Sequence, residues 1–172
     1  LSFALVDFEL LERTPKHEEA IRQSKRRSYL VKQAHRFEAR EDFPPGLSPI
    51  RIMEVDYVYG KVESTGGALW VVGRDPMLFD YFLPEKWRTT PRTRLSFMSH
   101  VYETVTKDSI HLVWRLSRVG ERPDADPYIE NERKILAHGY NSPFEEISYA
   151  MELSRKGIAT TYPRAIYRSG HK

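Results

Sequence analysis

No cysteine occurs among the 172 residues of the chain. This absence excludes disulfides, thiolate zinc sites, iron–sulfur clusters and a cysteine nucleophile, and it favours a reducing compartment, so we expect a cytoplasmic protein. Long hydrophobic runs are absent too. The apolar opening of residues 1–6 ends at Asp7, far short of the roughly 20 residues that a membrane-spanning helix needs. We therefore expect no membrane partner.

The familiar signatures of catalytic and cofactor sites are also missing. The six histidines form no HExxH or other ligand-spaced pair with a carboxylate, which argues against a metal site. No GxSxG, GxxxxGK[ST] or helix-preceding GxGxxG pattern occurs, so the hydrolase, phosphate-loop and dinucleotide signatures are absent. The neighbouring Glu145 and Glu146 would point about 100° apart on a helix, which does not suit two carboxylates that share a proton.

The residues that are present are typical of one folded domain. Apolar residues make up 40% of the chain and charged residues 30%, and a chain of this length can bury a single core. The formal net charge of +3 and the pI near 9.1 favour anionic partners, although surplus lysine and arginine often serve solubility alone. Because the first residue is leucine, we expect the chain to be either a piece of a longer protein or a trimmed form of one. These numbers leave the oligomeric state open.

Residues 1–45 are expected to form an N-terminal strand and a basic helix outside the core. Thr14 followed by Pro15 is a helix start, and the helix should run from about 15 to 40. Its surface is either a solvated charged face or a docking site for RNA or another polyanion. The basic side chains concerned are Arg22, Lys25, Arg26, Arg27, Lys32, Arg36 and Arg40. Three prolines within 43–49 predict a linker.

The core, residues 50–172, is expected to be an α+β domain with a mostly antiparallel sheet of about five strands packed on one main helix. Two hairpins are predicted, one from 51–63 and 68–72 and the other from 100–106 and 110–119. Ser142 and Glu145 form a capping-box pattern, and Gly157 can end the same helix, which predicts a helix over 142–156. A last strand over 158–167 contains Pro163, which predicts a sheet edge or a bulge.

The order of these elements is similar to that of the N-terminal lobe of protein-kinase-like and aminoglycoside-phosphotransferase-like proteins. A hairpin with a Gly66-Gly67 turn comes first, then a strand carrying Arg115, then the capped helix with Glu145 and Glu146. The resemblance implies that ATP and Mg²⁺ are bound and that the glycine turn covers the ATP phosphates. It also implies that Arg115 replaces the strand lysine and that one of the two glutamates holds Arg115 by a salt bridge. We expect this pair beneath the glycine turn.

The sequence departs from that family in two ways, which leaves an alternative function open. Arginine is a fixed planar fork and not a compact ammonium, and no HRD or DFG motif follows before Lys172. The chain would therefore be the nucleotide-contacting half of a larger protein, without complete catalysis. In the alternative, the chain is a non-catalytic basic module that binds RNA or a protein partner. Gly66-Gly67 is then an ordinary hairpin turn, and Arg115 faces solvent.

Overall fold

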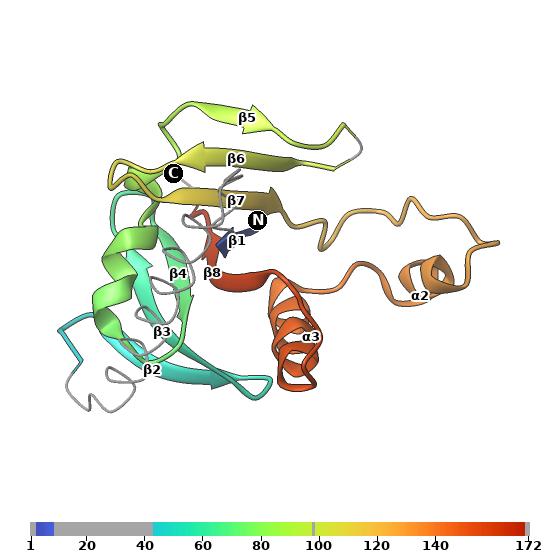
Figure 1. Ribbon diagram of the computed structural model, residues 1–172, viewed down its shortest axis with the longest axis horizontal. Helices are drawn as coiled ribbons and strands as arrows, with labels where there is room; N and C mark the ends of the chain where they lie inside the picture. The colour runs from blue at the N-terminus through green and yellow to red at the C-terminus, as the bar shows by residue number, and fades with distance from the viewer. Residues whose placement is uncertain (1–2, 9–42, 98, 171–172) are drawn as a thin grey trace, which may run out of the picture.

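The computed structural model describes residues 3–8, 43–97 and 99–170, and within these ranges the fold is α+β. Eight strands form one sheet in the order β2-β3-β4-β8-β1-β7-β6-β5, in which every neighbouring pair is antiparallel (Figure 1). The strands are β1 (Phe3–Phe8), β2 (Leu47–Ile52), β3 (Val55–Val62), β4 (Gly67–Val72), β5 (Arg92–Arg94), β6 (Val101–Val105), β7 (His111–Leu116) and β8 (Tyr162–Arg168). The expected sheet of about five strands is therefore too small.

The first strand lies in the middle of the sheet. β1 pairs with β7 on one side and with β8 on the other, so Leu5 lies between Arg115 and Ile166. The prediction placed residues 1–45 outside the core, but β1 joins the two halves of the sheet. A strand that comes from far away in sequence leaves no local signal of its pairing, which explains the difference.

Both predicted hairpins are present, and the predicted linker contains a strand. β3 and β4 flank the turn that contains Gly66, and β6 and β7 form the second hairpin. The stretch 51–63 is not one strand, because Met53 and Glu54 adopt positive φ angles and turn the chain from β2 into β3. β2 includes Pro49 and lies at the sheet edge, where a proline is tolerated because one side of the strand needs no ladder donor.

Pro163 has a different setting. It lies in β8, which is an interior strand, and the register of β8 with β1 shifts between Val6 and Asp7, where Asp7 pairs with Pro163. Of the two settings predicted for this proline, the irregularity in the ladder is the one observed.

Two hydrophobic clusters cover the two faces of the sheet. On one face, α3 (Pro143–Arg155) packs against a cluster around the fully buried Ile147, with Phe144 and Met151 partly buried beside it. On the other face, the 3-10 helices η1 (Pro76–Phe82) and η2 (Pro84–Lys86) help to bury a larger cluster that includes Trp87, Trp114 and Tyr167. Figure 1 shows η1 and α3 on opposite sides of β3 and β4. Alternation along each strand sends neighbouring residues to opposite faces.

The helix over 142–156 is confirmed with the capping box that predicted it. The Ser142 side chain accepts from the Glu145 amide, and the Glu145 carboxylate accepts from the Ser142 amide at 2.6 Å. A second helix, α2 (Glu130–His138), was not predicted. Figure 1 shows it on an excursion that leaves the sheet between β7 and α3. None of the helices in residues 43–170 is long and apolar enough to cross a membrane.

Candidate functional site

Arg115 and Glu146 meet between the sheet and α3, as predicted. Arg115 projects from β7 toward the helix, and its Nη2 forms an ion pair with Oε2 of Glu146. The two side chains are 38% and 27% exposed, so the pair is only partly shielded from solvent. A pair in this setting typically contributes about 0–1 kcal/mol to stability. The position of the pair therefore says more about its possible function than its contribution to stability does.

Glu145, the alternative partner for Arg115, has another role. Its carboxylate closes the capping box at the start of α3. Because adjacent helical positions point in different directions, only Glu146 is aimed along the face that meets β7. The sequence left the choice between the two glutamates open, and the structure selects Glu146.

The glycine turn lies away from this pair. β8 and β1 separate β4 from β7, which at about 4.8 Å per strand places the two strands about 14 Å apart. The expected position of the Arg115 pair beneath the turn is therefore wrong. The amides of Thr65, Gly66 and Gly67 also already donate within the turn, to Val62 O, Glu63 O and Thr65 Oγ1.

Packing explains why glycine is needed at this turn. A Cβ at Gly67 would collide with the carbonyl oxygen of Arg168, and a Cβ at Gly170 would collide with the backbone of Gly66. The turn and the end of β8 therefore approach each other more closely than side chains allow. This close packing supports the interpretation of Gly66-Gly67 as an ordinary hairpin turn.

The basic helix predicted over 15–40 lies outside the described residues. This includes the proposed polyanion-binding side chains of Arg22, Lys25, Arg26, Arg27, Lys32 and Arg36. Their binding of RNA stays a prediction.

A cavity of about 310 Å³ opens on the opposite face of the sheet. Its aromatic wall comes from the residue that follows η2 and from the strands β6, β7 and β8. Two arginines, a leucine and a serine complete the lining. The residues are Trp87, Arg88, Arg92, Tyr102, Trp114, Leu116, Tyr167 and Ser169. The volume lies at the lower end of the range for small-molecule sites, which are usually lined by apolar and aromatic side chains with a few polar groups.

The two arginines of the cavity lie against aromatic rings. The Arg92 guanidinium is 4.8 Å from the centroid of the Tyr102 ring and 5.7 Å from that of Trp114. Arg88 lies 5.7 Å from the Tyr167 ring, and its Nη1 donates to the Tyr167 hydroxyl at 3.3 Å. Both are solvent-exposed, and within the described ranges neither forms an ion pair with a carboxylate. Cation–π contacts orient the guanidinium planes and leave most of their N–H donors free.

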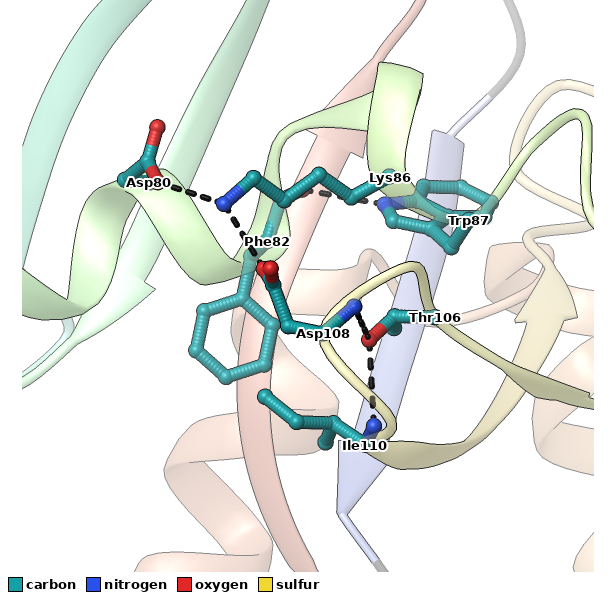
Figure 2. A network of polar contacts seen from close by, with 7 residues as sticks. All are labelled: Asp80, Phe82, Lys86, Trp87, Thr106, Asp108 and Ile110. Carbon is teal, nitrogen blue, oxygen red and sulfur yellow. Dashed lines mark hydrogen bonds and ion pairs between the residues drawn. The ribbon is translucent and has the colours of Figure 1, made fainter.

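A polar network holds the wall that carries Trp87 and Arg88 (Figure 2). Lys86 Nζ lies 2.5 Å from Asp80 Oδ2 and 2.7 Å from Asp108 Oδ2, and its carbonyl accepts from the Lys107 amide. These contacts join η1 and η2 to the turn between β6 and β7. The hydrogen bonds that Lys86 donates to Asp108 and Asp80 raise the pKa of its ammonium group, so its charge is kept well beyond neutral pH.

Figure 2 also shows how Trp87 is fixed. Its indole Nε1 donates to the carbonyl of Phe82 at 3.0 Å. Thr106 Oγ1 accepts from the amides of Asp108 and Ile110 and so shapes the turn that Lys86 binds. The wall is therefore held in place by contacts within the protein, as is usual for binding sites.

The hydrogen-bonding capacity of the Trp114 indole is less completely satisfied than that of the Trp87 indole. Only 6% of the residue is exposed, its Nε1 is fully buried, and this donor has no hydrogen-bond partner among the residues that the structure describes. Tyr102 stacks on the ring with centroids 4.6 Å apart, and Trp87 lies at 5.4 Å at an angle. Protein side chains therefore enclose the Trp114 indole, and its N–H group is shielded from solvent.

No family model, curated protein or solved structure matches this chain. Its function is therefore argued from the geometry of its own residues. In the described part of the chain, no group of three or more His, Asp or Glu side chains is arranged to hold a metal ion.

The sequence predicts Trp114 on a strand face but contains no pattern that predicts this cavity. Arg88 and Arg92 follow η2 in a stretch without a clear hydrophobic period. Tyr167 is brought beside them only by the pairing of β1 with both β7 and β8. The available signal was local composition, because 87–92 holds three arginine or tryptophan residues next to a predicted aromatic hairpin.

Proposed function

We propose that this chain is a binding domain for a small phosphorylated compound, which Arg88 and Arg92 hold at the mouth of the aromatic cavity. The observation that carries the proposal is the charge of the lining. Two guanidinium groups face one cavity, and the lining contains no carboxylate. Arginine forks bind phosphate oxygens bidentately, and their charge-assisted hydrogen bonds are about twice as strong as neutral ones.

The aromatic wall supports a compound that is more than an inorganic anion. The rings of Trp87, Tyr102, Trp114 and Tyr167 contribute apolar surface beneath the arginines, with Tyr102 and Trp114 stacked and Trp87 tilted or edge-on to its neighbours. Such a surface favours a ligand with an apolar or ring-shaped part, since burial of apolar area contributes roughly 25 cal/mol per Å². The proposal assigns no catalysis to the site.

A second candidate function, the ATP-contacting half of a kinase-like protein, is supported by the Arg115–Glu146 pair. That pair resembles the charged pair that such proteins use to orient a phosphate-binding cation. The position of the glycine turn and its occupied amides give this candidate less support than the cavity gives the first.

Calorimetric titration with ribose 5-phosphate, and with ATP in the presence of Mg²⁺, separates the two candidates. We expect Arg92→Ala and Arg88→Ala each to weaken ribose 5-phosphate binding about tenfold or more, and Arg115→Ala to leave it unchanged. The three variants remove the same guanidinium, from two exposed positions and from one half-buried position outside the cavity, and so control for one another. ATP binding that is lost only in Arg115→Ala would favour the kinase-like function. Absence of ribose 5-phosphate binding at millimolar ligand would contradict the cavity proposal.

A further inference from the structure

We infer that the open edge of β5 binds an acidic, extended peptide segment of a partner protein, which adds to the sheet as a further strand beside Arg92 and Arg94. β5 ends the sheet order, so within the described ranges one side of this strand has no neighbour (Figure 1). All three of its residues are exposed. The inference goes beyond the proposed function, because it concerns the rim of the sheet and not the compound in the cavity.

The hydrogen-bond register shows which backbone groups of β5 face outward. The amide of Leu95 donates to the carbonyl of Val101, which continues the register of β5 with β6 and marks a hydrogen-bonded pair. Such pairs alternate with non-hydrogen-bonded pairs along an antiparallel ladder. Thr93 is therefore the next residue bonded to β6, while the amides and carbonyls of Arg92 and Arg94 point to the open side. No partner for these four groups lies in the part of the chain that the structure describes.

An open edge of this kind is a template for an extended peptide. In β-strand addition, main-chain hydrogen bonds supply affinity, and alternate side chains of the added strand supply specificity. The other edge of the sheet, β2, is a poorer template, because Pro49 has no amide hydrogen to donate. β5 contains no proline, so both of its outward amides can donate.

The side chains of this edge define the charge of the peptide. Directly opposite residues share a sheet face, so Arg94 lies on the face of Tyr102 and the cavity, and Arg92 lies on the same face. Arg94 donates to the carbonyls of Ser96 and Phe97, which holds its guanidinium at the end of β5. Carboxylates on alternate residues of the added strand would lie opposite the two arginines, where opposite charges stabilise a sheet.

A second copy of β5 fits this edge poorly. Antiparallel pairing of two copies centred on Thr93 would place arginine opposite arginine on one face. Like charges directly opposite each other destabilise a sheet. An acidic partner meets no such repulsion, so charge complementarity selects it as the occupant.

The first test titrates the full chain into the fluorescein-labelled peptide Thr-Glu-Val-Glu-Thr-Gly-amide and follows fluorescence anisotropy. One matched peptide has glutamine in place of both glutamates, and another carries a methyl group on every backbone nitrogen. We expect each change to weaken binding about tenfold or more, because the first removes the charges and the second removes the main-chain donors. Equal binding of the methylated peptide would overturn strand addition, and equal binding of the glutamine peptide would overturn the acidic specificity. Absence of binding at millimolar chain would overturn both.

The second test changes the edge itself. Arg94→Ala removes the guanidinium and keeps the outward amide, whereas Arg94→Pro removes both. A proline whose nitrogen faces the open side is compatible with the ladder between β5 and β6. We expect Arg94→Ala to weaken binding of the glutamate peptide about fivefold, and Arg94→Pro to weaken it about fivefold more. Equal binding by the two variants would contradict main-chain pairing at this residue. The methylated peptide tests the same pairing on the unaltered chain, so the inference can fail without any variant.

Discussion

Replacement of Ile147 by alanine tests the packing of α3 on the sheet. Ile147 is completely buried in the cluster that also contains Tyr57, Trp70 and Ile166. At about 0.8 kcal/mol per methylene, the carbons lost from isoleucine correspond to about 2.4 kcal/mol of transfer free energy. The cavity that they leave adds to this cost, and the better helix propensity of alanine subtracts a few tenths. We expect Ile147→Ala to lower the free energy of unfolding by about 3 kcal/mol.

Urea denaturation followed by tryptophan fluorescence measures this loss, since Trp70 lies in the same cluster. Leu153→Ala is the matched control. Leu153 lies on the same helix but is 39% exposed, so its truncation should cost less than about 1 kcal/mol. An equal loss in the two variants would show that the face of α3 assigned to the sheet is wrong. An unchanged m-value would confirm that only stability changed.

Two further predictions concern the polar network and the glycine turn. The pKa of Lys86 in the folded protein lies above its ordinary value of 10.5. Its contribution to the free energy of unfolding is therefore complete below its ordinary pKa of 10.5 and is lost as the pH rises through the folded-state pKa. Lys86→Met should therefore lose less stability than the wild type between neutral pH and about pH 11, measured by urea midpoints. Gly67→Ala should destabilise by about 1–3 kcal/mol, because its Cβ would meet the Arg168 carbonyl; an unchanged thermal midpoint would contradict this packing.

Local signals in the sequence predicted the elements that are defined by local chemistry. The second hairpin was predicted from alternation in 110–116, and β7 places Leu112 and Trp114 on one face and Arg115 on the other. The α3 helix was predicted from its caps, which are contacts between residues three apart. Both patterns are complete within a short window, so no knowledge of the rest of the chain is needed.

Features that depend on distant partners were missed, namely the place of the predicted N-terminal strand in the sheet and the strands β2 and β5. β1 is held by β7 and β8, each more than 100 residues away. β5 has three residues and becomes a strand through its pairing with β6. β2 contains Pro49 within a proline-rich stretch, and only its edge position makes that residue acceptable in a strand. Pairing decides these segments, and a single sequence does not display pairing.

The same difference between local signals and distant pairing applies to the candidate site. The contact of Arg115 with Glu145 or Glu146 was predicted because the order of strand and capped helix is similar to that of kinase-like proteins, and the structure shows the pair with Glu146. The cavity was not, because its lining comes from four separate segments whose meeting depends on strand order. The glycine turn was assigned to phosphate on composition, whereas close packing against Gly170 accounts for its glycines.

The alternation of β7 and β8 also makes binding and stability separable. Trp114 and Tyr167 face the cavity, while their neighbours Arg115 and Ile166 face α3. A substitution on the α3 face therefore changes the free energy of unfolding without removing a group that touches the ligand. The cavity arginines are exposed and lack ion-pair partners within the described ranges, so their removal costs little stability. A loss of binding in Arg88→Ala or Arg92→Ala can consequently be assigned to the site itself.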